Sequence, residues 1–146
     1  MSHDARHVVN ELIVDIFKNI LDLEEKYHQL HGIELSMTEI HTLDSIQKNK
    51  TKPMSDVAKS LNVTQGTLTT TVKRLEQKGF VKRVKDDKDR RINRLELQDS
   101  AYSVLKIHEQ FHEEMIAGVL QQGEVNPELI QSIKNLNEFF KTIDKK

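Results

Sequence analysis

The sequence predicts a mainly α-helical protein that carries one small β-hairpin. Only two prolines and five glycines interrupt 146 residues, so long helices are expected. Over most of the chain, apolar residues recur every three or four positions, which is the spacing of a helix with one buried face. Residues 80–86 and 92–98 instead alternate apolar and polar side chains, as the two strands of a hairpin do.

The boundaries of the helices follow from capping residues and from apolar spacing. "SMTE" at residues 36–39 is a capping box. Pro53 suits the first turn of a helix, Thr64 can cap the next one, and Gly79 can end it. Asp99 and the pair Asn126-Pro127 can begin two further helices. The helices are therefore predicted at residues 4–30, from residue 36 onward, at 53–61, at 64–79, at about 99–122 and from residue 126 onward.

Bulk composition excludes several classes of protein. With no cysteine, the chain has neither disulfides nor thiolate metal sites. Its N-terminus is polar where a signal peptide would be apolar, and no apolar run approaches the ~18 residues of a membrane span. We therefore expect a cytoplasmic protein with no membrane partner. Glycine-rich phosphate loops and nucleophile motifs are missing, so an enzyme is not expected.

The charge of the chain is unevenly distributed. The net charge is only −1, but residues 48–94 hold 14 Lys or Arg and five Asp or Glu, a local charge of +9. The rest of the chain holds eight basic and 18 acidic residues, a charge of −10. A basic centre between acidic flanks indicates binding to a polyanion. The alternative is a solvated basic face with no partner.

The basic centre has the order of elements of a winged helix-turn-helix. Residues 53–61 and 64–79 form two helices separated by the tight turn "LNV", and the predicted hairpin follows them. In such motifs the second helix lies in the major groove of DNA, and its N-terminal residues reach the base edges. Double-stranded DNA is therefore the predicted partner.

The second helix of this motif has an unusual outer face, with five threonines between residues 64 and 71. Threonine offers a hydroxyl to bases or phosphates and a methyl to thymine, glutamine can pair with adenine, and glycine lets the backbone approach closely. Basic residues after them can meet phosphates. The alternative is a merely solvated surface. The predicted DNA contacts in this helix are Thr64, Gln65, Gly66, Thr67, Thr69, Thr70, Thr71, Lys73 and Arg74.

The hairpin, or wing, carries further basic residues. An arginine at a hairpin tip can enter the narrow, electronegative minor groove. Asp89 can instead hold one arginine in place through a bidentate pair, so some of these arginines are expected to be structural. The predicted DNA-binding residues of the wing are Arg83, Lys85, Lys88, Asp89, Arg90 and Arg91.

These features together resemble the MarR family of bacterial transcriptional regulators, and the similarity covers nearly the whole chain. It rests on the long first helix, the winged helix-turn-helix, "DKDRR" in the wing and the two closing helices. The resemblance implies one domain over residues 1–146. Residues 36–98 would bind DNA, and residues 4–34 and 99–146 would form a helical dimerisation region. It also implies a homodimer on a pseudo-palindromic operator, with half-sites about 10 base pairs apart.

Within that family, "MTEIHTLDSI" and "VTQGTLTTTVKRLEQKGFVKRV" resemble the branch that represses fatty-acid synthesis genes. The resemblance implies a long-chain acyl-acyl carrier protein as corepressor, with its acyl chain in an apolar pocket of the dimerisation region. The same apolar stripes are more simply explained as ordinary core and dimer interface. A MarR regulator of another small-molecule response is a further alternative. The predicted pocket residues are Ile16, Ile20, Leu23, Tyr27, Leu43, Phe111 and Met115.

Histidine placement supports a second alternative, a zinc-responsive repressor of the same family. His108 and His112 share one helical face, a spacing that can chelate one metal. If the helices meet, His41 and Glu24 could complete an N/O site for Zn²⁺. The chain departs from its zinc-sensing relatives because it has no cysteine and no His-rich run after the wing. These histidines can also be explained, and more simply, as partly buried polar residues, and effector contact is a third alternative, so no cofactor is firmly predicted.

Overall fold

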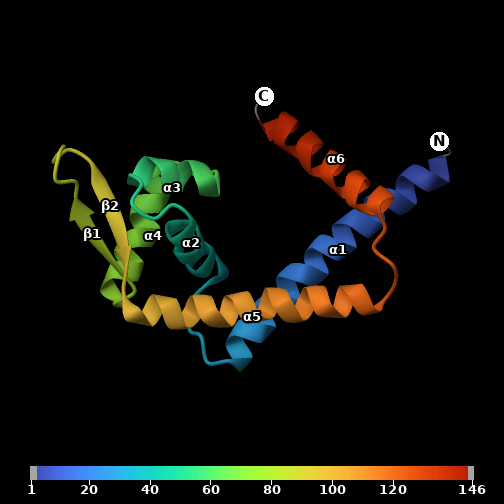
Figure 1. Ribbon diagram of the computed structural model, residues 1–146, viewed down its shortest axis with the longest axis horizontal. Helices are drawn as coiled ribbons and strands as arrows, with labels where there is room; N and C mark the ends of the chain where they lie inside the picture. The colour runs from blue at the N-terminus through green and yellow to red at the C-terminus, as the bar shows by residue number, and fades with distance from the viewer. Residues whose placement is uncertain (1–2, 145–146) are drawn as a thin grey trace. The chain divides into compact units, whose positions relative to one another are not determined.

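The computed structural model describes residues 3–144 and confirms the predicted order of elements (Figure 1). A small antiparallel hairpin follows four helices, and two further helices close the chain. The elements are α1 (His3–Leu30), α2 (Met37–Lys48), α3 (Met54–Leu61), α4 (Gln65–Gln77), β1 (Val81–Lys85), β2 (Asn93–Leu97), α5 (Asp99–Gln121) and α6 (Pro127–Asp144).

The chain divides into two compact units, Met1–Phe111 and His112–Lys146. The first unit contains α1 to α4, the hairpin and the first half of α5. The second contains the rest of α5 and α6. The division between the units falls within α5 and so does not coincide with the predicted boundary at residue 99. The assignment of residues 4–34 and 99–146 to dimerisation stays a prediction.

Local capping fixes the start of the two helices that matter most for the site. Ser36 Oγ accepts from the Glu39 amide at 3.1 Å, and the Ser36 amide donates to Glu39 Oε1 at 3.0 Å. This is the predicted capping box of α2. Thr64 Oγ1 accepts from the Thr67 amide at 3.1 Å and caps α4 as predicted. Pro53 is the N-cap of α3 rather than its first residue, since its ψ of 158° is extended and not helical. Proline is tolerated at this helix start because its ring removes only an amide that would be unpaired there.

Two residues in left-handed backbone conformation shape the helix-turn-helix. Asn62 has φ +56° and ends α3, so the chain reverses into α4 within three residues. Asparagine tolerates this conformation better than most residues with a Cβ. Gly79, with φ +84°, follows α4 and turns the chain into β1, the predicted helix stop.

The wing is a regular two-stranded hairpin. β1 and β2 pair antiparallel with Val81 opposite Leu97 and Lys85 opposite Asn93. Val81 and Leu95 are buried while Lys82 and Glu96 are exposed, so the period-two pattern places one face on the core. Pro53 forms an isolated bridge with Arg94 and ties the start of α3 to β2.

The core of the first unit lies between α2, α3, α4, the inner face of the hairpin and the first turns of α5. Ile40, Leu43, Val72 and Leu75 are fully buried in it. Ala58 is 3% exposed on α3, consistent with a small residue where helices pass closely. The core cluster consists of Ile33, Ile40, Leu43, Ile46, Val57, Ala58, Leu68, Val72, Leu75, Val81, Leu95, Ala101, Val104 and Leu105.

The second unit exposes many apolar side chains. α6 begins where Asn126 Oδ1 accepts from the Leu129 amide at 2.8 Å. From Leu129 to Ile143 its large apolar residues are between 39% and 57% exposed. Between residues 3 and 144, no helix has the length and hydropathy that crossing a membrane requires.

Candidate nucleic-acid interface

Helix α4 is anchored by one face and exposes the other. Leu68, Val72 and Leu75 are at most 1% exposed and fix the helix on the core. On the opposite side, Gln65, Gly66, Thr67 and Thr70 are exposed and Thr69 is half-buried. In Figure 1, α4 lies beside α2, α3 and the hairpin. The sequence therefore presents the N-terminal half of α4 on a rigid support, as a recognition helix requires.

The threonine hydroxyls of this face are largely bonded within the helix itself. Thr69 Oγ1 donates to the Gln65 carbonyl at 2.8 Å, and Thr70 Oγ1 donates to the Gly66 carbonyl at 3.1 Å. Thr64 Oγ1 donates to Thr67 Oγ1 at 3.0 Å. Such bonds to the preceding turn are common for threonine in helices. The hydroxyls are therefore less available as donors to DNA than the sequence suggested.

Thr71 is a correction to the predicted DNA contacts. Its side chain is 3% exposed and belongs to the buried face of α4. Its hydroxyl donates to the Thr67 carbonyl at 3.2 Å and accepts from Arg74 Nη2 at 3.5 Å. Thr71 lies three residues from Leu68 and four from Leu75, so helical spacing turns it toward the core.

Gly66 has no internal reason to be glycine. Its backbone is helical, and a Cβ added there would meet only Thr64 Oγ1, at 3.9 Å. Glycine within a helix costs about 1 kcal/mol relative to alanine. The missing side chain leaves the outer face of α4 slim beside Gln65, which is exposed. Lys73 and Arg74 are exposed about two turns further along and are available to phosphates.

Two aspartates organise the wing. Arg94 Nε donates to Asp86 Oδ1 at 2.7 Å, and Asp86 also accepts from the Asp89 and Lys88 amides. These bonds, the Asp89 amide first and then Arg94, lower the pKa of the Asp86 carboxyl. Asp86 was absent from the predicted site. A carboxylate three residues before another in a hairpin tip is a turn signal that could have revealed it.

Arg91 and Asp89 form the bidentate pair that the sequence predicted for an arginine of the wing. Arg91 Nε and Nη2 donate to Asp89 Oδ1 and Oδ2, both at 3.0 Å. The side chain of Arg91 is nevertheless 90% exposed, so the pair orients it without hiding it. The hydrogen bond from Arg91 lowers the pKa of Asp89, and the same bond raises the pKa of Arg91.

The other basic residues of the wing divide into paired and exposed ones. Arg83 Nη2 binds Glu76 Oε1 at 3.2 Å and is half-buried against α4. Arg90, Lys85 and Lys88 are exposed. Arg90 forms no ion pair within residues 3–144. DNA contact by Arg83 stays a prediction. Its ion pair with Glu76 gives Arg83 a second role, which is to attach the wing to α4.

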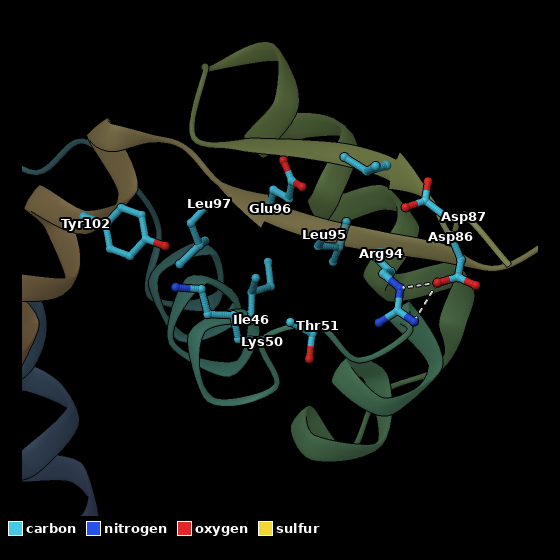
Figure 2. Close-up of a pocket in the computed structure, with 11 residues that line it drawn as sticks. Ile46, Lys50, Thr51, Asp86, Asp87, Arg94, Leu95, Glu96, Leu97 and Tyr102 are labelled. Carbon is cyan, nitrogen blue, oxygen red and sulfur yellow. Dashed lines mark hydrogen bonds and ion pairs between the residues drawn. The ribbon is translucent and has the colours of Figure 1, made fainter. Parts of the chain in front are cut away.

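A pocket of about 810 Å³ lies behind the wing (Figure 2). Figure 2 shows the Asp86–Arg94 ion pair at one end of it and Tyr102 of α5 at the other. Lys50 Nζ lies 5.7 Å from the centre of the Tyr102 ring, within reach of a cation–π contact. None of the residues predicted for the effector pocket lines it.

The predicted effector residues do not form one enclosed site in the described chain. Leu43 is a correction: it is fully buried in the core of the DNA-binding part, where its apolar side chain faces inward from α2. Tyr27 and Phe111 do meet, with ring centres 5.4 Å apart. Ile16 and Leu23 are 55% and 54% exposed on α1, and Ile20 is half-buried. Met115 belongs to the second unit.

Three of the four predicted metal ligands converge. Ligand atoms of Glu24, His41 and His108 all lie within 4.8 Å of one another. His41 Nε2 is 2.6 Å from Glu24 Oε1, and His108 Nδ1 is 3.5 Å from the same oxygen. Glu24 is 3% and His108 5% exposed. The fourth predicted ligand, His112, is exposed in the second unit, and its part in this site stays a prediction.

His28 belongs to the same cluster and was missed from the sequence. Its Nε2 lies 3.1 Å from His108 Nδ1, its Nδ1 bonds the Glu24 carbonyl, and the side chain is 1% exposed. His28 follows Glu24 by four residues on α1, so the pair shares a helical face. That spacing is the signal that could have found it.

Comparisons with known proteins agree with this geometry. The pattern of the MarR family matches residues 35–92. The structure is similar to Streptococcus pneumoniae FabT in complex with DNA, with 31% identity, a TM-score of 0.79 and 96% of this chain and 98% of that chain covered. It also shares its fold with a MepR–DNA complex of S. aureus (20% identity, TM-score 0.74, 91% and 96% covered). The regulator BldR of Sulfolobus solfataricus is a third structure with this fold (24% identity, TM-score 0.69, 94% of this chain and 99% of that chain covered).

The FabT similarity extends over almost the whole of both chains, whereas the family pattern covers α2, the helix-turn-helix and the wing only as far as the residue before β2. Together they establish that this chain belongs to the MarR family of winged-helix, DNA-binding transcriptional regulators.

Proposed function

We propose that this protein is a dimeric repressor of fatty-acid synthesis genes that uses a long-chain acyl-acyl carrier protein as corepressor. The observation that carries the proposal is the 31% identity to S. pneumoniae FabT over 96% of this chain. The stretches "MTEIHTLDSI" and "VTQGTLTTTVKRLEQKGFVKRV" add to it, because they form α2, α4 and the start of the wing. As a member of a family of transcriptional regulators, the chain is not an enzyme.

The proposed mode of DNA binding uses α4 and the wing together. Gln65, Gly66, Thr69 and Thr70 would face the major groove, since they occupy the exposed N-terminal half of a firmly packed helix. The exposed arginines at the tip of the wing would reach the adjacent minor groove. FabT, which is 31% identical to this chain, was solved in complex with DNA, which supports DNA binding by this fold.

The proposed homodimer follows from apolar side chains that this chain leaves exposed. Large contiguous apolar surfaces are rare on monomeric proteins and mark interfaces. Two helices, each considered by itself, expose many large apolar side chains. The residues concerned are Val8, Val9, Leu12, Ile13, Val14, Ile16, Phe17 and Leu21 of α1, and Leu129, Ile130, Ile133, Leu136, Phe139, Phe140 and Ile143 of α6.

The proposed acyl site uses Ile16, Ile20, Leu23, Tyr27 and Phe111 of the first unit, with Leu43 removed from the set. A pocket of about 520 Å³ in the first unit offers a further apolar surface. It is lined by Ile33, Phe80, Val104 and Ile107 among others, and Val104 and Ile107 belong to the apolar stripe of α5. Lys78 stands at this pocket but is already paired with Glu39, at 3.0 Å.

The experiment that tests the proposal is fluorescence anisotropy on a labelled duplex from the host's fatty-acid synthesis promoter. The titration is made with the protein alone, with long-chain acyl-acyl carrier protein and with the same carrier lacking an acyl chain. Tightening by the acylated carrier and not by the bare carrier is the expected result. Equal affinity in all three titrations would refute the corepressor.

The histidine cluster favours a second candidate function, a zinc-responsive repressor. Glu24, His41 and His108 supply one carboxylate oxygen and two imidazole nitrogens, a donor set that suits Zn²⁺. Their 4.8 Å spread needs only small side-chain movements to reach common ligand distances of ~2.0–2.2 Å. His41 also lines a pocket with Thr67 and Thr71 of α4. One residue of the cluster therefore lies beside the proposed recognition helix.

Zinc binding can be tested without DNA by isothermal titration calorimetry with Zn²⁺ alone. His41→Ala is expected to weaken binding by tenfold or more, because it removes one of three ligands. His31→Ala is the matched control, since His31 is exposed and bonds the Tyr27 carbonyl outside the cluster. Equal weakening by both variants, or no binding by the wild type, would remove this candidate and leave the cluster a structural role.

A further inference from the structure

We infer that Thr69 and Thr70 recognise thymine in the operator through their methyl groups and not through their hydroxyls. The inference deepens the proposed function, because it rests on α4 lying in the major groove. It assigns a base and a chemical contact to two residues of the recognition helix. Contact with thymine's 5-methyl group in that groove is a known form of direct readout.

The first observation is where the hydroxyl protons go. Thr69 Oγ1 donates to the Gln65 carbonyl at 2.8 Å, and Thr70 Oγ1 donates to the Gly66 carbonyl at 3.1 Å. Each hydroxyl carries a single proton. While these bonds hold, neither side chain can donate to a base or a phosphate.

The second observation concerns the methyl groups. The hydroxyl and the methyl occupy different staggered positions on the same Cβ. With the hydroxyl directed at a backbone carbonyl of the preceding turn, the methyl points elsewhere. Thr70 is exposed and Thr69 half-buried, and in each the methyl is the side-chain group that is not engaged with the backbone carbonyl.

The third observation is the space around these methyls. A helical side chain lies over the turn that precedes its own Cα. Thr70 therefore lies over Gly66, which has no side chain, and a Cβ added there would meet only Thr64 Oγ1, at 3.9 Å. No side chain at position 66 stands between a thymine methyl and the Thr70 methyl. Thr69 lies likewise over Gln65, whose exposed amide is free to pair with a neighbouring base.

The test removes one methyl at a time from each partner. A duplex of about 30 base pairs, long enough for two half-sites, is selected by the full-length protein from a random pool. Its thymines are then replaced singly by deoxyuridine, which pairs as thymine does but lacks the 5-methyl group. At one or two positions in each half-site, we expect affinity to fall about fourfold per methyl, which corresponds to ~0.8 kcal/mol.

The protein variants complete the cycle. Thr69→Ser and Thr70→Ser keep the hydroxyl and remove the methyl, so each should weaken binding to the thymine duplex by a similar factor. On the matching deoxyuridine duplex, the serine variant should bind no worse than the wild type does. Thr69→Val and Thr70→Val keep a methyl and remove the hydroxyl, and should retain affinity and sensitivity to deoxyuridine.

Three outcomes would overturn the inference. Deoxyuridine could have no effect at any position, the serine and deoxyuridine effects could simply add at every position, or the valine variants could lose as much affinity as the serine ones. Circular dichroism on each variant confirms that α4 is intact. If the wild type selects no duplex, the proposed function fails too, whereas normal DNA binding without a methyl effect refutes this inference and leaves the function standing.

Discussion

At the scale of single residues, the polar side chains of this protein are largely committed to one another. Glu39 illustrates the point. It closes the capping box of α2 and also binds Lys78 at the end of α4, at 3.0 and 3.1 Å. Burial opposes ionisation of Glu39, but hydrogen bonds from Ser36 and Lys78 outweigh it and lower the pKa of this carboxyl.

A pH-dependent stability follows from Glu39. Because its folded-state pKa lies below its ordinary value of 4.5, its contribution is fully present above about pH 5 and is lost as pH falls through the folded-state pKa. Glu39→Gln should lower the free energy of unfolding by about 1 kcal/mol at pH 7 and by less at pH 3. Thermal unfolding at the two pH values measures the difference.

Glu138→Gln is the matched control for Glu39→Gln. Glu138 also pairs with a lysine, Lys141, but the two side chains are 73% and 61% exposed, so its loss should change stability little. An equal loss at pH 7 and pH 3 in the Glu39 variant would mean that packing, and not ionisation, accounts for its effect.

The wing arginines differ in what they are free to do. Arg94 is held by Asp86 and is 35% exposed, whereas Arg91 is 90% exposed and oriented by Asp89. We expect Arg91→Ala to weaken DNA binding by about 1–3 kcal/mol while the fold remains intact. Anisotropy measures the binding, and circular dichroism the fold.

Asp89→Asn separates the charge of Arg91 from its orientation. It keeps the arginine but loosens the bidentate pair, so an intermediate loss of affinity is expected. If Arg91→Ala binds as the wild type does, Arg90 takes over as the candidate for the minor groove, because Arg94 is engaged with Asp86.

At the scale of elements, α4 shows a conflict between stability and function. Its glycine at position 66 weakens the helix without any internal steric reason. Gly66→Ala should therefore raise the free energy of unfolding by about 0.5–1 kcal/mol. The same Cβ would stand on the side of α4 that we propose faces DNA, so affinity for the operator should fall.

The control for Gly66→Ala is Gly118→Ala, on α5, where an added Cβ meets nothing within 4 Å. That variant should gain stability and keep its affinity for DNA. Gly66→Ala binding as tightly as the wild type would show that α4 does not approach the DNA backbone or bases closely at this turn.

At the scale of the whole molecule, the uneven charge distribution predicts a steep salt dependence. Residues 48–94 carry a charge of +9 within a chain of −1, so DNA binding should release several counterions. The logarithm of the binding constant should fall with the logarithm of salt concentration with a slope of about −0.9 per phosphate contact. A flat response in anisotropy titrations would contradict an interface dominated by phosphate contacts.

Dimerisation is the second prediction at this scale. Ile133 is 57% exposed on α6, and Ile133→Glu places a charge on the apolar side of that helix. We expect this variant to sediment as a monomer at concentrations where the wild type is a dimer. Gln131→Glu adds the same charge at an already polar position of α6 and should remain dimeric. Identical sedimentation of all three proteins as monomers would refute the proposed dimer.

The sequence by itself determined the elements and the nature of the partner. Helix starts at Ser36 and Thr64, the stop at Gly79 and the period of the wing strands are local signals, because caps and side-chain alternation depend on residues a few positions apart. The bidentate Asp89–Arg91 pair was predictable because its two residues are only two positions apart. The basic centre was predictable because charge can be counted along the chain without knowing the fold.

Only the tertiary structure decided which polar groups meet and which are buried. It placed Leu43 and Thr71 in the core, joined Glu39 to Lys78, and brought Glu24, His28, His41 and His108 together. These residues lie on different helices or on the less obvious side of one. Such contacts depend on how the helices pack, and periodicity along one helix carries no information about the partner that it faces.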